Sequence, residues 1–166
     1  MNANDEPVQR VRLPIDVSYH WSAGPGTASH LAGLLEGRLI GRRCPACALV
    51  YFPPRGGCCP RDGVLLGDDV EIADRGTITT FCIVNVPFLG QRIEIPYVAA
   101  TILLDGADIG MSHLIQEIPA DEVRIGMRVE AVWKPRDDWG PGLDNIEHFR
   151  PTGELDAAPD SYSRSA

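Results

Sequence analysis

The feature that most constrains this chain is a group of cysteines between residues 44 and 59, four of the five that the sequence contains. Cys44 and Cys47 form a Cys-x-x-Cys turn, which lets two thiolates face one ion. A second cysteine turn about a dozen residues later can complete a tetrahedron. Pro45 and Pro60 each follow a cysteine and stiffen the two turns. The spacing predicts a zinc ribbon.

The fourth ligand of this ribbon is open. The second turn reads Cys59-Pro60-Arg61-Asp62-Gly63, with an aspartate where a four-cysteine ribbon has its last thiolate. Zinc accepts carboxylate oxygens as well as thiolates, so Asp62 can serve; Cys58 is the alternative, although adjacent cysteines rarely both turn inward. A degenerate, metal-free ribbon is a third interpretation. The predicted cofactor is zinc, and the predicted ligands are Cys44, Cys47, Cys59 and Asp62, with Cys58 as the alternative fourth.

The odd cysteine count and the lack of an apolar leader in residues 1–14 favour a reducing, cytoplasmic compartment over disulfides. No apolar run approaches the roughly 20 residues that span a bilayer. The formal net charge of −8 disfavours nucleic acid and anionic membranes as partners.

Against this acidic background, the stretch from Gly37 to Arg61 holds five arginines and no Asp or Glu. One interpretation is that they are solvated and offset the charge of a thiolate-rich site. The other is that they bind a phosphate-bearing ligand or a partner, because the guanidinium fork suits phosphate. The candidates for such contacts are Arg38, Arg42, Arg43 and Arg55.

The first part of the chain divides into an arm, residues 1–26, and a helix with the ribbon, residues 27–66. Tyr19 and Trp21 are the expected anchors of the arm on another surface. A helix is predicted from Thr27 or Ser29 to Glu36, capped by a hydroxyl at its start and ended by Gly37.

Residues 67–151 contain short runs of β-branched and apolar residues separated by Pro, Gly and Asp. Five strands with one helical turn, Pro119–Val123, between the third and fourth follow the order of an OB-fold barrel. Residues 152–166 are expected to be a flexible tail. The fold class is mainly β, with an N-terminal helix, a small rubredoxin-like zinc ribbon and a five-stranded OB-fold barrel. The strands are predicted at Gly76–Val86, Tyr97–Leu104, Ala107–Ile115, Arg128–Trp133 and Ile146–Phe149.

No catalytic residues are predicted. Cys82 lies in an apolar run that would bury it, and the four histidines are scattered without a paired spacing. The connection Pro87–Pro96 carries apolar residues, which suggest a bound partner or acyl chain, or a loop folded back over the barrel mouth. These residues are Phe88, Leu89, Ile93 and Ile95.

Taken together, five motifs resemble the zinc-ribbon/OB-fold family of acyl-CoA-associated proteins, formerly a domain of unknown function. The resemblance covers about residues 30–152, and this chain departs from the family's four-cysteine pattern at Asp62 and by the extra Cys58. The motifs are Gly37-Arg38-Leu39-Ile40-Gly41, Tyr51-Phe52-Pro53-Pro54-Arg55, Pro96-Tyr97-Val98, Gly126-Met127-Arg128-Val129 and Phe149-Arg150-Pro151.

The resemblance implies a subunit that is not an enzyme by itself and binds a thiolase-like enzyme acting on acyl-CoA thioesters. In one branch of the family, such pairs are aldolases of steroid side-chain degradation. It also implies a heterotetramer or larger assembly and gives CoA phosphates as one possible ligand for the arginines. Two alternatives are a nucleic-acid-binding OB-fold module and a stand-alone acyl-CoA carrier.

Overall fold

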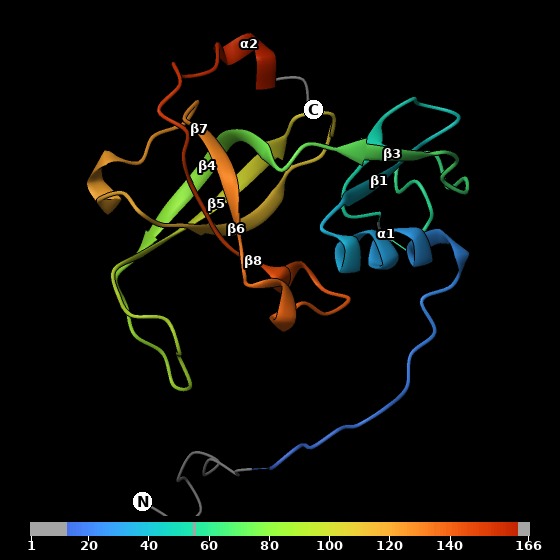
Figure 1. The fold of residues 1–166 in the computed structure, drawn as a ribbon, viewed down its shortest axis with the longest axis horizontal. Helices are drawn as coiled ribbons and strands as arrows, with labels where there is room; N and C mark the ends of the chain where they lie inside the picture. The colour runs from blue at the N-terminus through green and yellow to red at the C-terminus, as the bar shows by residue number, and fades with distance from the viewer. Residues whose placement is uncertain (1–12, 55, 163–166) are drawn as a thin grey trace, which may run out of the picture.

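The computed structural model describes residues 13–54 and 56–162, and Figure 1 shows a ribbon region and a β-barrel side by side. The ribbon region contains a three-stranded antiparallel sheet in the order β2-β1-β3, with one helix packed against it. Its elements are α1 (Pro25–Glu36), β1 (Leu39–Arg43), β2 (Val50–Tyr51) and β3 (Asp69–Ile72).

Helix α1 begins two residues before the predicted start. Pro25 occupies the first turn after Gly24, and no side chain caps the helix. The expected hydroxyl cap at Thr27 or Ser29 is therefore wrong, because the fixed φ of proline is already suited to the first helical position. Ser29 instead donates its hydroxyl hydrogen to Asp69 on β3. The helix ends as predicted at Gly37, whose φ of 75° a residue without Cβ adopts readily.

The second part of the chain forms a closed five-stranded barrel in the order β4-β5-β6-β8-β7, which confirms the predicted OB-fold. All neighbouring strands are antiparallel except β6 and β8, whose parallel pairing closes the barrel. The expected helical turn between the third and fourth barrel strands is η1. The elements are β4 (Arg75–Val84), β5 (Tyr97–Leu104), β6 (Met111–Ile115), η1 (Ala120–Glu122), β7 (Arg128–Trp133), η2 (Arg136–Asp138), η3 (Leu143–Asn145), β8 (Ile146–Pro151) and α2 (Pro159–Tyr162).

Two local predictions in this region are corrected. The strand predicted from Ala107 begins only at Met111, because the chain first turns at Gly106 and sends Asp108 to the ribbon. Cys82 is exposed rather than buried. Successive side chains of a strand face opposite sides, so an apolar run does not bury every member.

The described residues pack into two cores of unequal size. The small core contains Cys44, Tyr51, Cys59 and Leu66. The large core joins the barrel to the helix and sheet of the ribbon region, so the packing crosses the expected boundary near residue 66. Its buried members are Leu34, Leu39, Val50, Phe52, Ile72, Ile78, Val98, Ala100, Ile102, Leu104, Met111, Ile115, Val123, Met127, Val129, Ile146 and Phe149.

Polar contacts reinforce this junction. The buried Asn145 side chain donates to the carbonyl oxygens of Leu34 in α1, at 2.9 Å, and of Gly140, at 2.8 Å. Val50 and Asp108 are joined twice, by the Val50 N–H to the carboxylate and by the Asp108 N–H to the Val50 carbonyl. Buried polar groups satisfied in this way fix the two regions against each other.

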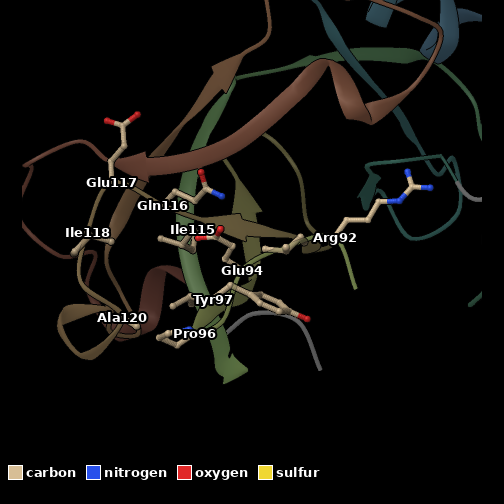
Figure 2. A pocket seen from close by; sticks show the side chains of 11 residues that line it. Arg92, Glu94, Pro96, Tyr97, Ile115, Gln116, Glu117, Ile118 and Ala120 are labelled. Carbon is tan, nitrogen blue, oxygen red and sulfur yellow. The ribbon is translucent and has the colours of Figure 1, made fainter. Parts of the chain in front are cut away.

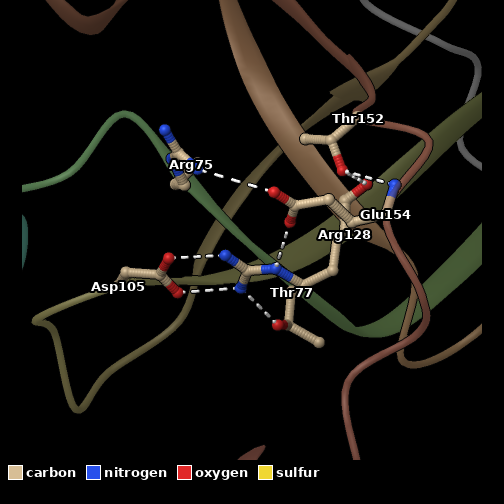
Figure 3. Close-up of polar contacts among 6 residues, drawn as sticks. All are labelled: Arg75, Thr77, Asp105, Arg128, Thr152 and Glu154. Carbon is tan, nitrogen blue, oxygen red and sulfur yellow. Dashed lines mark hydrogen bonds and ion pairs between the residues drawn. The ribbon is translucent and has the colours of Figure 1, made fainter.

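Residues 152–162 lie against the barrel, whereas the sequence suggested a free tail from residue 152; residues 163–166 are outside the described part. Figure 3 shows Glu154 of this segment between two barrel arginines, Arg75 and Arg128, at 3.6 and 3.5 Å. Arg128 also forms a two-pronged pair with Asp105. Backbone bonding adds to this, because Ala157 N–H donates to the Gly126 carbonyl at 2.8 Å.

Within the described ranges, neither helix has the length and apolar character required to cross a membrane.

Candidate metal centre and partner surface

Two tight turns bring the predicted ligands together. Cys44 directly follows β1, and the backbone N–H groups of Ala46 and Cys47 both point at its sulfur, at 3.4 Å. In the second turn the Gly63 N–H donates to the Cys59 carbonyl at 2.9 Å, with Gly63 at a φ of 68°. Such N–H groups aimed at sulfur are the usual support of a thiolate in a metal-binding turn.

Cys44, Cys47, Cys59 and Asp62, here called the Cys3Asp cluster, place one sulfur or oxygen atom each within 4.8 Å of all the others. The Cys47 and Cys59 sulfurs are 3.8 Å apart, and the Asp62 Oδ2 lies 3.6 Å from Cys44 Sγ and 3.4 Å from Cys59 Sγ. Tetrahedral zinc, with bonds of about 2.3 Å to sulfur and about 2.1 Å to oxygen, separates two sulfurs by about 3.8 Å and a sulfur from an oxygen by about 3.6 Å. The residues fit the ion.

The carboxylate in the cluster is held in its charged form. Hydrogen bonds from the Cys47 and Cys59 thiols lower the pKa of Asp62. For Cys47, the Leu49 backbone acts to lower the pKa, but burial and the Asp62 carboxylate together raise it to about 11. A bound cation would take the place of the thiol protons, as metal binding to cysteine generally releases them.

Tyr51 is a neighbour of the cluster whose contact with a predicted ligand the sequence did not indicate. Its hydroxyl lies 3.2 Å from the Cys59 sulfur, and the side chain is buried. That hydrogen bond, with burial, raises the pKa of Tyr51, so the phenol keeps its proton and can donate to a thiolate. The available signal was a tyrosine between the two cysteine turns, at a position that the structure places on β2.

Cys58, the alternative fourth ligand, is not a member of the Cys3Asp cluster. The Cys58 side chain is exposed, and its backbone pairs with Leu65 in an isolated bridge. None of the five cysteines forms a disulfide.

The arginines of the basic stretch do not converge on one point. Arg38 pairs with Glu71 at 2.7 Å, Arg42 with Asp69 at 3.1 Å, and Arg43 donates to the Ala48 carbonyl at 3.0 Å. Arg55 lies outside the described residues. Asp69 and Glu71 come from β3, downstream of the acid-free stretch, and Glu36, 3.4 Å from Arg38, comes from α1 just before it. The folded surface is therefore less basic than the stretch alone indicates.

The connection between β4 and β5, residues 87–96 and here called the apolar loop, extends away from the barrel (Figure 1). Leu89 is 105% exposed and Phe88 is 61% exposed, while Ile93 and Ile95 are partly covered. This exposure does not match the alternative in which the loop folds back over the barrel mouth. Apolar residues gathered on an exposed loop are typical of a protein-binding surface.

A groove of about 570 Å³ lies where the apolar loop rejoins the barrel. Figure 2 shows the side chains of Pro96, Tyr97 and Ile115 along it, with Arg92 and Glu117 at its edges. Its volume is in the range of small-molecule sites, and its lining mixes apolar and charged groups. The loop and the groove therefore form one continuous surface at this end of the barrel.

Comparisons with known proteins agree with this architecture. Residues 31–65 match the family model "ChsH2, rubredoxin-like zinc ribbon domain", and residues 69–134 match "ChsH2, C-terminal OB-fold domain". The chain thus contains a zinc ribbon domain, and its Cys3Asp cluster could hold a metal ion.

Among curated proteins, a DUF35 domain-containing scaffold protein from Methanocaldococcus jannaschii is 36% identical over 99 residues, covering 58% of this chain and 67% of the relative. A probable enoyl-CoA hydratase alpha subunit from Thermomonospora curvata is 34% identical over 114 residues, covering 69% of this chain. The chain spans only about a third, 34%, of that second relative.

Among solved structures, the Ltp2-ChsH2(DUF35) aldolase matches with a TM-score of 0.55 and 29% identity, covering 75% of this chain and 93% of the matched chain. A DUF35-family protein of unknown function from Sulfolobus solfataricus shares the fold, with a TM-score of 0.54 and 18% identity over 77% of this chain and 84% of its own. With its zinc ribbon and its OB-fold barrel, the protein therefore belongs to the DUF35 family.

Proposed function

We propose that this chain is a non-catalytic accessory subunit that binds and stabilises a thiolase-like enzyme acting on acyl-CoA thioesters. Two kinds of relative support the proposal. One is a scaffold protein, and the other is a chain of the Ltp2-ChsH2(DUF35) aldolase, whose name gives two components. The enoyl-CoA hydratase subunit from Thermomonospora curvata supports acyl-CoA chemistry. A retro-aldol cleavage in steroid side-chain degradation is the specific reaction we propose for the complex.

The observation that carries the proposal is the exposed apolar loop. Leu89 and Phe88 point into solvent on a connection that a self-sufficient barrel would keep polar. Large apolar side chains of this kind are enriched where protein interfaces bury surface. We propose that Phe88, Leu89, Ile93 and Ile95 contact the enzyme, with the ribbon arginines as a second contact to the enzyme or to CoA phosphates.

The proposed ligands of zinc are the members of the Cys3Asp cluster. Four protein ligands leave no open position, so zinc would supply structural stability there rather than bind substrate. The chain's own residues hold the two turns in place, and Tyr51 supports Cys59. In the proposed complex, which we expect to be a cytoplasmic heterotetramer or larger, the reacting groups would belong to the enzyme.

Co-expression with a thiolase-fold protein encoded beside this chain tests the proposal. The two should co-elute from a size-exclusion column. The double variant Phe88→Asp with Leu89→Asp should abolish co-elution, and the matched control Leu155→Asp should not, because Leu155 is 94% exposed on a different segment. Failure to co-elute with any such neighbour would contradict the proposal.

The stand-alone acyl-CoA carrier is favoured by one observation, the groove of about 570 Å³ beside the apolar loop. Calorimetry of the isolated chain with an acyl-CoA separates the two functions. An accessory subunit need not bind acyl-CoA alone, whereas a carrier must bind it with a stoichiometry near one.

A further inference from the structure

Upstream of α1, apolar and other residues alternate without a break. From Leu13 to Trp21 the chain reads Leu-Pro-Ile-Asp-Val-Ser-Tyr-His-Trp. Every odd position is a large apolar residue, and every even position is polar or proline. A period of two is the pattern of a strand with one buried face. Residues 13–21, here called the alternating segment, precede the regions that match the ChsH2 family models.

Among the residues that the structure describes, none covers these apolar side chains to any large extent. Leu13, Ile15, Val17, Tyr19 and Trp21 are between 65% and 84% exposed. The segment belongs to no helix or strand and leads away from α1 (Figure 1). In a strand conformation these five large apolar side chains would lie on one side, and they would gain free energy by covering another surface.

The described part of this chain offers the segment few places to bind. The edge strand β3 is short and carries Asp69 and Glu71, which pair with Arg42 and Arg38. Charged side chains on short edge strands oppose the addition of another strand. The edge strand β2 has two residues, and the closed barrel leaves an edge along the later part of β4, beyond its pairing with β7.

A second copy of the chain is a weaker partner than a different protein. Strand β4 pairs with β7 only over Arg75–Thr77, so its later part offers an edge. However, two copies would each bring a net charge of −8, and like charges oppose their association. The alternating segment itself carries a single carboxylate, Asp16, so it can lie on an uncharged surface without leaving several charges unpaired.

We infer that residues 13–21 bind as an extended strand, with the odd-numbered side chains inward, to the edge of a sheet on the partner enzyme. This inference rests on the proposed function and names a second contact beside the apolar loop. At about 3.3 Å per residue the bound segment would cover about 26 Å of the enzyme. Backbone hydrogen bonds would give affinity and the alternate side chains would give register, as in other cases of strand addition.

The experiment uses the full chain and the thiolase-fold protein that co-elutes with it, with the dissociation constant measured by calorimetry. Val17→Ser, Tyr19→Ser and Trp21→Ser together should weaken binding at least about 30-fold, the effect of losing hot-spot aromatic residues. The matched control changes the other face, with Asp16→Asn, Ser18→Ala and His20→Gln, and should stay within about threefold of the parent. Equal losses in both triple variants would overturn the inference.

Insertions distinguish binding as a strand from non-specific hydrophobic binding. One serine inserted between Val17 and Ser18 moves Tyr19 and Trp21 to the opposite face and should weaken binding about as much as the first triple variant. Two inserted serines restore the alternation and should recover part of the affinity. If one and two insertions are equivalent, the segment does not bind as a strand.

The two proposals fail in different ways. If the parent chain binds no thiolase-fold partner, the proposed function fails. If it binds and the first triple variant binds equally well, only the inference about residues 13–21 fails. Light scattering on the isolated chain should show a monomer; a dimer that the first triple variant abolishes would assign the segment to a second copy and overturn the inference.

Discussion

The small core at the Cys3Asp cluster and the large core of the barrel are held together by different means. The large core buries seventeen residues, drawn from both the barrel and the ribbon region. The small core buries four, of which Cys44 and Cys59 are also metal-ligand candidates. A region with so little buried apolar surface gains only modest stability from packing, so a bound ion has most to contribute there. The following predictions test this contrast, from the largest expected effect to the smallest.

Cys47→Ser should have the largest effect, because it removes one thiolate from the cluster. We expect metal content, measured by mass spectrometry, to fall from one zinc per chain to almost none. Structural zinc in small peptides contributes apparent free energies of about 10–16 kcal/mol, so residues 44–66 should exchange their amide hydrogens much faster. Strand β5 should keep its protection. If the variant melts and exchanges like the parent, the ribbon does not depend on a metal.

Phe149→Ala tests the other core. Phe149 is fully buried on β8 and lies edge-on to His113, with ring centroids 5.4 Å apart. Removing a buried phenyl ring should lower the free energy of unfolding by about 3–5 kcal/mol, measured by urea denaturation. Zinc content should be unchanged, and Glu147→Ala on the exposed side of β8 serves as the control. Loss of zinc in Phe149→Ala would show that the two cores are not separable.

Asp62 gives a finer test of the cluster. Asp62→Ala should weaken zinc binding about 100-fold or more, since loss of even an outer-shell group costs about 10–100-fold. Asp62→Cys should bind at least as tightly as the parent, because it restores four thiolates. Competition with a chelator measures both. Cys58→Ser is the control, and an effect of Cys58→Ser as large as that of Asp62→Ala would assign the fourth position to Cys58.

The smallest expected effect is on the pH dependence of stability, and it comes from His30, which packs against Phe52 of the large core. His30 is buried, with Nδ1 donating to the Ile40 carbonyl at 2.9 Å, and burial lowers its pKa below the ordinary 6.5 although that bond opposes the change. The unfolded chain therefore binds more protons, so stability is complete above about pH 6.5 and falls as the pH drops toward the folded pKa. His30→Gln should reduce this decrease in urea denaturation between about pH 7.5 and 5.5. An unchanged slope would exclude His30 as its source.

Much of the fold could be predicted because its signals are local. The cysteine turns, Gly37 and the β-branched runs each specify their conformation within a few residues. Strand β3 was not predicted, because its face with Asp69 and Glu71 is charged and exposed. The strand forms by pairing with β1, which lies far from it in the sequence, so local residue patterns do not reveal it. Cys82 was misplaced because burial on a strand depends on which face the barrel takes.

The candidate site could be predicted only in part for the same reason, because it depends on contacts between residues distant in the sequence. Spacing alone left Asp62 and Cys58 as alternatives, and only the closed second turn shows that the carboxylate reaches the three sulfurs. For the arginine stretch, the sequence left two interpretations open, and it could not show that Arg38 and Arg42 pair with Glu71 and Asp69 of β3.

The hydrogen bond from Asn145 to Leu34 limits how far helix α1 can move relative to the barrel. Because the Asn145 amide connects the last turn of α1 to the barrel, and Leu34 in that turn is fully buried, the helix cannot swing freely when the segment before it is pulled. Only residues 22–24 separate Trp21 from the start of α1, so tension applied at Trp21 would pass through this helix to the barrel. A protein that binds the chain near Trp21 would therefore keep the barrel close to itself, and it could also fix the orientation of the barrel.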